Sequence, residues 1–133
     1  MPSNQASPPT PIRDSTELFN PLIRQWFAQL GPPTDIQRQA WPAIAKSKHC
    51  LITAPTGSGK TLTAFLWAIN GFVTGSLATG RTRVLYISPL KALNNDIRNN
   101  LLQPLTQLKE LAAQKGLPFP DIRVQTRSGD TDA

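Results

Sequence analysis

The spacing of apolar residues predicts three helices in the first half of the chain. Residues 20–31 begin with the cap and first-turn pair Asn-Pro, place their apolar side chains on one face, and end at a glycine. A second helix is predicted from Thr34, and Pro42 should kink or restart it. A third begins at Lys60, where apolar residues recur at helical spacing through Val73.

The chain also contains three short runs that include apolar residues. Residues 50–54, 84–88 and 122–126 each combine apolar and β-branched residues over a length typical of a buried strand. Helical patterns separate the last two runs, one beginning near Lys91 and a new one at Pro104 that ends at Gly116. This alternation predicts an α/β fold, a parallel sheet with helices on both faces, in which ligands bind at the carboxyl ends of the strands.

Composition limits the domain organisation. A chain of 133 residues has room for one modest domain. Residues 1–16 are rich in Pro and Ser, so we expect a disordered tail there and the folded part in residues 17–133. No signal peptide or membrane anchor is recognisable in that tail, and a cytoplasmic location is expected. A single cysteine, Cys50, excludes an intramolecular disulfide, and zinc-ligand spacing is missing.

Basic residues are unevenly distributed. The formal net charge is +6, and residues 36–95 contain seven basic residues and no acidic one. Such a stretch suits polyphosphate or a nucleic-acid backbone. A moderately basic solvated surface would have the same composition, so charge alone does not decide between the two.

The segment 54–61 has the spacing of a Walker A phosphate loop, with Ala in place of the first Gly. Gly57 and Gly59 let the backbone curl so that its N–H groups face phosphate oxygens. Lys60 can reach the β- and γ-phosphates, and the Thr61 hydroxyl is placed to bind Mg²⁺. A simple strand-to-helix turn would not explain Lys followed by Thr. We therefore predict ATP and Mg²⁺ as cofactors, held by Thr56, Gly57, Ser58, Gly59, Lys60 and Thr61.

The loop resembles that of superfamily 2 DExD/H-box helicases, which commonly have Ala at the first Walker position. Upstream, residues 31–44 resemble the Q motif of this family, whose Gln reads adenine, so the resemblance assigns that role to Gln37. Thr34 and Gln37 also fit a capping box, in which Gln37 bonds back to the Thr34 amide. With the phosphate loop downstream, we favour adenine recognition. Phe19 could stack on the base, although core packing is the commoner use of an aromatic residue.

Two segments after the loop resemble nucleic-acid-binding motifs of the same helicases. Residues 89–93 resemble motif Ia, so the resemblance assigns Pro89 and Lys91 to the phosphate backbone of single-stranded DNA or RNA. Residues 126–131 resemble motif Ib and assign Gly129 and Thr131 to the same strand. Ordinary surface turns, one with an exposed lysine, are the alternative for both segments.

The amino-acid sequence of residues 85–95 and 127–131 is most similar to that of the large helicase-related (Lhr) group and its Ski2-like neighbours. The resemblance spans residues 19–131 and implies the N-terminal portion of a first RecA-like domain in an ATP-driven helicase moving 3′ to 5′. Lys60 and Thr61 are its implied catalytic residues. A stand-alone ATP-binding module without turnover is the alternative, and a small-molecule kinase would need neither Gln37 nor residues 89–93.

Hydrolysis in these helicases needs groups that the sequence does not contain. A strand-end Asp-Glu pair should hold Mg²⁺ and position water, and arginines of a second motor domain should stabilise the transferred phosphate. We therefore expect a chain truncated before Walker B, inactive alone. In the resembled fold, other strands lie between residues 50–54 and 84–88, so these two runs are expected to expose apolar faces and edges.

Overall fold

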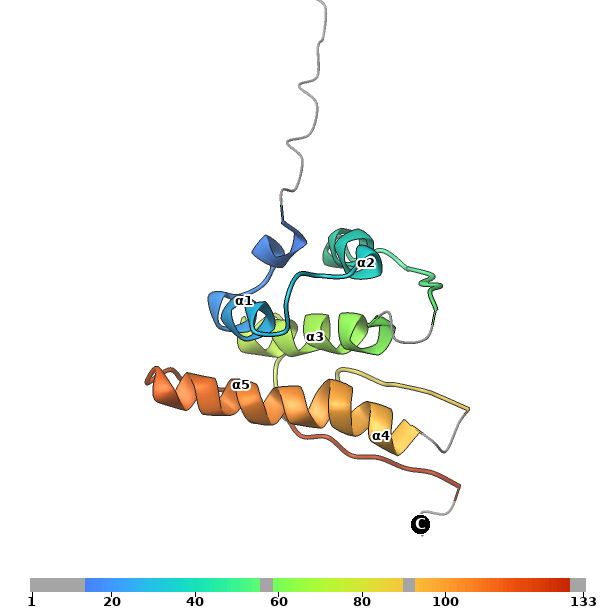
Figure 1. Ribbon diagram of the computed structural model, residues 1–133. Helices are drawn as coiled ribbons and strands as arrows, with labels where there is room; N and C mark the ends of the chain where they lie inside the picture. Colours follow the sequence, from blue (N-terminus) through green and yellow to red (C-terminus); the bar gives the residue numbers. More distant parts are fainter. Residues whose placement is uncertain (1–13, 56–58, 90–92, 130–133) are drawn as a thin grey trace, which may run out of the picture.

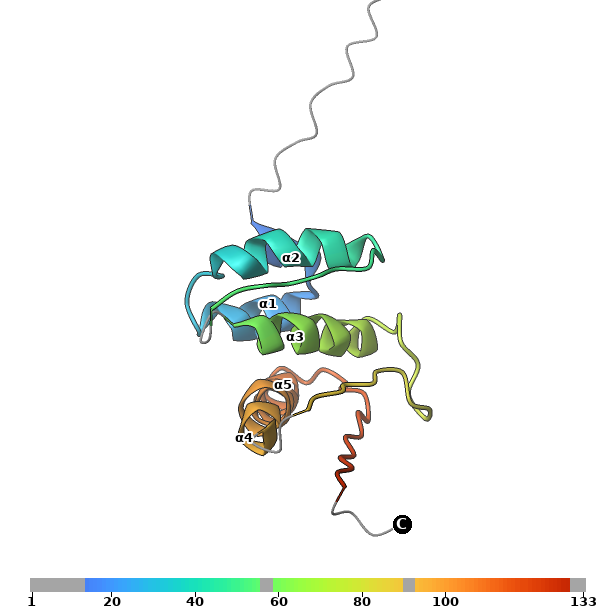
Figure 2. The same cartoon turned by 90° about the vertical axis from the view of Figure 1, so that its right-hand side faces the viewer.

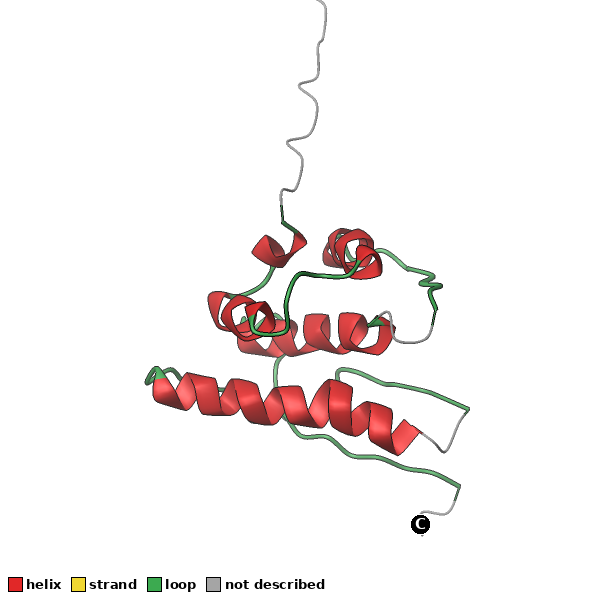
Figure 3. Cartoon of the chain, viewed as in Figure 1, coloured by secondary structure: helices red, strands yellow, loops and turns green. Residues whose placement is uncertain are grey.

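The structure is a computed structural model that describes residues 14–55, 59–89 and 93–129. It consists of helices joined by loops and extended segments (Figures 1 and 3). In chain order the elements are the 3₁₀ turn η1 (Ser15–Leu18) and α1 (Pro21–Ala28), then α2 (Asp35–Ala45), α3 (Lys60–Val73), α4 (Leu93–Ile97), the π-helical segment η2 (Arg98–Leu102) and α5 (Gln103–Gln114).

The first three α-helices begin where the sequence predicts them, α1 and α2 with side-chain caps and α3 after Gly59 without one. The Asn20 side chain accepts a hydrogen bond from the Leu22 amide at 2.9 Å at the start of α1. Thr34 caps α2, and Pro42 is accommodated inside that helix. Beyond α1 the chain turns at Gly31 with φ of 104°, a conformation that favours glycine.

The predicted new helical segment at Pro104 is α5, which begins at Gln103 with Pro104 in its first turn. It follows α4 and η2 directly, so the three form one continuous helical rod from Leu93 to Gln114 (Figure 1). Pro104 lacks the N–H that an α-helix would direct at the Asn100 carbonyl, and its ring crowds that carbonyl. The wider π turns of η2 fall just before the proline, where they accommodate this crowding. The rod ends as predicted at Gly116, with φ of 65°.

The core lies where α1, α2, α3 and α5 meet. Trp41 of α2 is fully buried, and Phe19 and Phe27 pack edge-on against its ring, with centroids 4.7 and 5.3 Å away. Phe19 is therefore a core residue, and its buried ring is not at the surface, where it could stack on a base. Other buried members come from α1, α3 and α5: Leu22, Ile23, Trp26, Leu66, Ile69, Leu108 and Ala112.

The three predicted strands do not form in the described residues, which contain no β-ladder (Figure 3). Residues 51–55, 84–89 and 122–127 are instead connecting segments. A strand requires a neighbour that accepts its backbone hydrogen bonds, and apolar sequence alone does not supply one. Leu51, Leu85 and Ile87 are 91%, 78% and 81% exposed, which matches the exposure expected for the first two runs.

The packed part of the chain begins earlier than the predicted boundary at residue 16. Ser15 and Thr16 belong to η1 and are buried. Asp14 caps this turn by accepting a hydrogen bond from the Thr16 amide at 2.9 Å, and its bonds to Thr16 lower the pKa of the Asp14 carboxyl. The expected tail of residues 1–13 lies outside the described residues. Within the described part, no helix has the length and apolar character needed to cross a bilayer.

Candidate functional site

The start of α3 carries the described part of the predicted phosphate loop. Gly59 is the N-cap residue, with a left-handed φ of 82°, so it turns the chain into the helix without a capping side chain. Its carbonyl accepts two hydrogen bonds from Thr63, one from the amide at 3.0 Å and one from the hydroxyl at 2.6 Å. The amides of this first turn and the positive end of the helix dipole suit an anion. Thr56, Gly57 and Ser58 lie outside the described residues.

Lys60 and Thr61 are the first two residues on α3 after that turn. The Lys60 ammonium donates a hydrogen bond to the Ala54 carbonyl at 2.5 Å, so it reaches back across the loop to the residue that opens it. Thr61 is half-buried on the same turn of helix. The predicted cation and hydroxyl therefore both lie on the first turn of α3.

Gln37 lies against this terminus from α2. Its side chain is buried, and its Oε1 accepts a hydrogen bond from the Thr34 amide at 2.9 Å, completing the capping box. A Cβ atom placed on Gly59 would lie only 2.6 Å from Gln37 Nε2. Gln37 therefore makes the capping contact and packs directly on Gly59, the residue before Lys60.

Trp41 provides a contact that sequence reasoning did not find. Its indole Nε1–H donates to the Thr63 carbonyl at 3.0 Å, in a fully buried position. The sequence indicates only that Trp41 faces the core. The sequence feature that could have indicated this bond is a tryptophan at a core position, since a buried indole N–H usually requires an acceptor.

Asn70 is a second residue whose role the sequence did not indicate. It is buried in the middle of α3, and its Oδ1 accepts a hydrogen bond from the Asn20 amide at 2.8 Å. The sequence feature that could have indicated this role is a polar residue on an apolar helical face, because a buried amide requires hydrogen-bond partners. This bond ties the beginning of α1 to the helix that carries Lys60.

The predicted nucleic-acid contacts are only partly described. Pro89 and Gly129 are exposed at the ends of their segments, whereas Lys91 and Thr131 lie outside the described residues. Segments 51–55, 84–89 and 122–129 all end on one side of the molecule, the right-hand side of Figure 1 that faces the viewer in Figure 2. The candidate loop and both candidate nucleic-acid segments therefore share a side.

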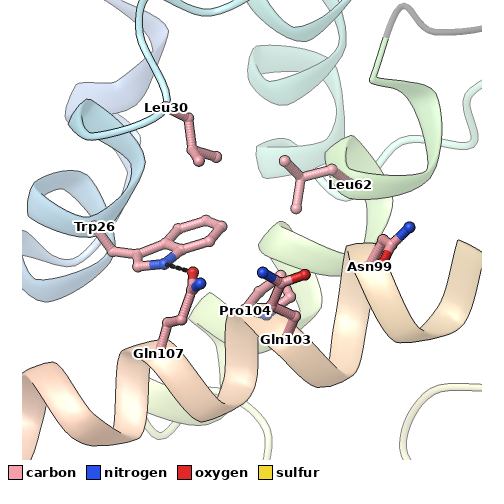
Figure 4. Close-up of a pocket in the computed structure, with 7 residues that line it drawn as sticks. All are labelled: Trp26, Leu30, Leu62, Asn99, Gln103, Pro104 and Gln107. Atoms are coloured by element: carbon pink, nitrogen blue, oxygen red, sulfur yellow. Dashed lines mark hydrogen bonds between the residues drawn. The ribbon is translucent and has the colours of Figure 1, made fainter.

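Neither of two surface hollows in the described part of the chain is lined by a predicted site residue. Figure 4 shows the first, of about 150 Å³, between α1, α3 and the long helical rod. Its lining comprises Trp26, Leu30, Leu62, Asn99, Gln103, Pro104 and Gln107. The second, of about 390 Å³, is lined partly by Arg24 and Arg38 beside the turn at Gly31. Neither lining includes Gln37, Gly59 or Lys60, so the candidate site is defined by its side chains and helix terminus.

Comparison with known families agrees with this geometry. The DEAD/DEAH box helicase family model matches residues 34–126, well over half of the chain. The chain belongs to the DEAD/DEAH box helicase family. The match begins at the capping residue of α2 and contains the candidate phosphate loop and the 84–88 segment.

Similar proteins come from bacteria and archaea. The chain is 49% identical over 115 residues to the Lhr helicase/probable uracil glycosylase of Mycolicibacterium smegmatis, covering 85% of this chain and 8% of that protein. It is 46% identical over 122 residues to ATP-dependent helicase Lhr-Core protein 2 of Thermococcus barophilus, covering 88% of this chain and 14% of that protein. The chain thus spans only a small part of these relatives' length.

A solved structure of Mycobacterium smegmatis helicase Lhr bound to ssDNA and AMP-PNP is similar to this DEAD/DEAH box chain. The TM-score is 0.79 at 48% sequence identity, and the match covers 90% of this chain and 15% of that one. At this identity the likeness implies an α/β P-loop fold. The helices of this chain are arranged as in that solved structure, although the predicted strand segments form no ladder in the described residues.

Proposed function

We propose that this chain binds ATP and nucleic acid as the N-terminal portion, residues 17–133, of the first RecA-like domain of an Lhr-type helicase. The observation that carries the proposal is the start of α3, where left-handed Gly59 opens the helix and Lys60 reaches back to the Ala54 carbonyl. On phosphate binding, the Lys60 ammonium would exchange that carbonyl for β- and γ-phosphate oxygens. The first-turn amides would hold the same group.

The donor set fits a magnesium nucleotide. Thr61 supplies a hydroxyl on the first turn of α3, and hydroxyl oxygens and phosphates are ligands that Mg²⁺ accepts. Residues 56–58 would complete the cradle. When bound, the ion supplies positive charge at the β- and γ-phosphates, while Lys60 and the helix terminus orient them.

Gln37 is the proposed base-recognition residue of this site. It packs on Gly59, which places its amide beside the loop that would hold the phosphates. An amide offers both a donor and an acceptor, the pair that the adenine edge requires. Its capping bond to Thr34 uses Oε1 and would orient the amide for that contact.

Nucleic acid is the proposed second ligand, bound through Pro89, Lys91, Gly129 and Thr131. The family and the ssDNA-bound relative support this assignment. The two segments end on the same side of the molecule as the candidate phosphate loop, which would place both ligands on one face (Figure 1). Backbone contacts of this kind position a strand without reading its sequence.

Hydrolysis and unwinding are proposed for the whole protein, because the 133-residue sequence offers no strand-end Asp-Glu pair. An ATP-dependent helicase working in the cytoplasm is the proposed activity. The alternative function, an ATP-binding module without turnover, would use the same residues. The two differ in nucleic-acid-stimulated phosphate release, which only the helicase supports.

Substitution of Lys60 tests the nucleotide site. In Lys60→Ala, binding of a fluorescent ATP analogue should weaken by at least about tenfold, since a charge-assisted bond to phosphate is lost. Lys46→Ala removes an exposed lysine beyond the end of α2 and serves as the matched control. Equal affinities for the Lys60→Ala chain and the unmodified chain would contradict the proposal.

A further inference from the structure

The indole of Trp41 connects the core to the predicted phosphate-binding turn. Trp41 is fully buried on α2, and its Nε1–H donates to the Thr63 carbonyl at 3.0 Å. Thr63 is also fully buried and lies one turn into α3. Its amide and hydroxyl both donate to the Gly59 carbonyl, at 3.0 and 2.6 Å. A continuous chain of hydrogen bonds, buried at Trp41 and part-buried at Gly59, therefore runs from Trp41 to the glycine that opens the helix.

The Trp41 ring is itself held in place. Phe19, at the end of η1, and Phe27, on α1, both pack edge-on against it. The indole cannot follow a displaced Thr63 without disturbing two other elements, because close-packed side chains have few alternative positions. The direction of the Thr63 carbonyl is thus fixed by the core.

Orientation matters at this turn because no side chain caps α3. Gly59 has none, and its left-handed conformation is accessible mainly to glycine. Phosphate binding by a helix terminus depends on several amides pointing at one place. A turn free to tilt or fray would present them less often, and the observed affinity falls with the competent fraction.

We propose that Trp41 is a positioning residue for nucleotide binding, whose indole N–H holds the first turn of α3 in its phosphate-binding orientation. This inference rests on the proposed ATP site. It assigns Trp41 no contact with nucleotide. Its influence passes through Thr63 and Gly59 and acts on the phosphate end of the ligand.

Trp26 provides a matched control within the same core. It is also buried, and its Nε1–H donates to Gln107 Oε1 at 2.8 Å on α5 (Figure 4). Trp41→Phe and Trp26→Phe each delete one indole hydrogen bond and keep an aromatic ring. Only Trp41 is bonded to the helix that follows the phosphate loop.

The experiment measures affinity for ATP, ADP and GTP, with thermal unfolding, in the unmodified chain and both variants. Trp41→Phe should bind ATP and ADP roughly three- to tenfold more weakly, the range of one buried hydrogen bond. Its ATP-to-GTP preference should stay unchanged, since Gln37 is not altered. Trp26→Phe should lose comparable thermal stability and keep its nucleotide affinity within about twofold.

Equal losses of affinity in the two variants, or unchanged affinity in Trp41→Phe, would overturn the proposal. If Trp41→Phe does not fold, Thr63→Val replaces it, because it removes the hydroxyl bond to Gly59 at nearly constant volume. That variant should also lose affinity for ATP and ADP alike, and unchanged binding would count against the proposal. An unmodified chain whose ATP binding is insensitive to Lys60→Ala would instead refute the proposed nucleotide site.

Discussion

Gln37 combines two requirements in one side chain. Its Oε1 completes the capping box with Thr34, and its Nε2 lies against the backbone of Gly59. The first contact stabilises the start of α2, whereas the second places an amide next to the candidate nucleotide site. A substitution that keeps one contact and removes the other can separate these roles.

Gln37→Glu makes this separation, because Glu at the third helical position retains the capping box but has no amide donor. We expect it to reduce the preference for ATP over GTP by about tenfold, near the lower end of the value of a paired base contact. Its thermal stability should stay close to that of the unmodified chain. Competition of ATP and GTP against a fluorescent nucleotide measures the preference.

Gln37→Ala is the comparison, since it removes both contacts. It should show the same loss of preference and also lower the free energy of unfolding by about 1 kcal/mol, the usual value of a cap. For Gln37→Glu, the quantity to compare is the ratio of the ATP and GTP affinities, because the new carboxylate repels both nucleotides. If Gln37→Glu keeps the original ratio, Gln37 has the capping role alone.

Residue patterns in the sequence were sufficient for groups that act locally. The capping box of Thr34 and Gln37 was predictable from two positions three residues apart, and it is formed. The assignment of Lys60 and Thr61 to phosphate and Mg²⁺ rests on the spacing of one loop and stays a prediction. The Trp41 bond to Thr63 joins positions 22 residues apart on different helices. Such a contact depends on how helices pack, and the linear pattern carries no signal for its partner.

At the scale of elements, α3 connects the candidate site to the rest of the core. Trp41 bonds to it near its beginning, and Asn70 bonds from it to the Asn20 amide further along. The Asn20 amide lies at the start of α1, where an α-helix leaves N–H groups in need of partners, and the Thr63 carbonyl accepts the Trp41 indole N–H in the first turn of α3. The packing of α1 and α2 on α3 is therefore directional as well as apolar.

Asn70→Ala tests the second of these connections. The Asn20 amide would lose its acceptor in a part-buried position, which costs roughly 1–3 kcal/mol in the free energy of unfolding. Urea unfolding followed by circular dichroism measures the loss. Asn100→Ala is the control, because the Asn100 side-chain amide donates to the Asp96 carbonyl of the same helical rod, at an exposed position. Similar losses in both variants would contradict a specific role for Asn70.

Helices and strands differ in what the sequence can predict. The starts of α1, α2 and α3 are correct because their caps and first turns are local. The 84–88 segment has the composition of a buried strand, yet forms no ladder in the described residues. Its backbone partners would have to come from elsewhere, and a strand's composition does not identify them. The π turns of η2 also had no signal except Pro104.

At the scale of the whole molecule, the chain has one packed side and one exposed apolar side. The 84–88 segment contacts the core through Tyr86, whose ring lies 5.0 Å from that of Phe65. Its alternate residues Leu85 and Ile87 face outward and are mostly exposed. Apolar residues on both faces are typical of strands that are covered on both sides, as in a parallel sheet.

We therefore predict that the isolated 133-residue chain associates with itself as its concentration rises. Exposed apolar residues on an extended segment provide both apolar area and backbone groups for pairing with another copy. The double variant Leu85→Lys, Ile87→Lys should suppress association, because charges on such an edge disfavour pairing. Sedimentation velocity over a concentration series measures the distribution of species.

Leu30→Lys is the matched control for this prediction. Leu30 is 55% exposed, but it follows α1 directly and belongs to no extended segment. Adding one lysine there raises the net charge without changing the 84–88 segment, so association should persist. If the control suppresses association as strongly as the double variant, general charge repulsion rather than this segment is responsible. An unmodified chain that stays monomeric throughout the series would show that the outward face of residues 84–88 does not drive association.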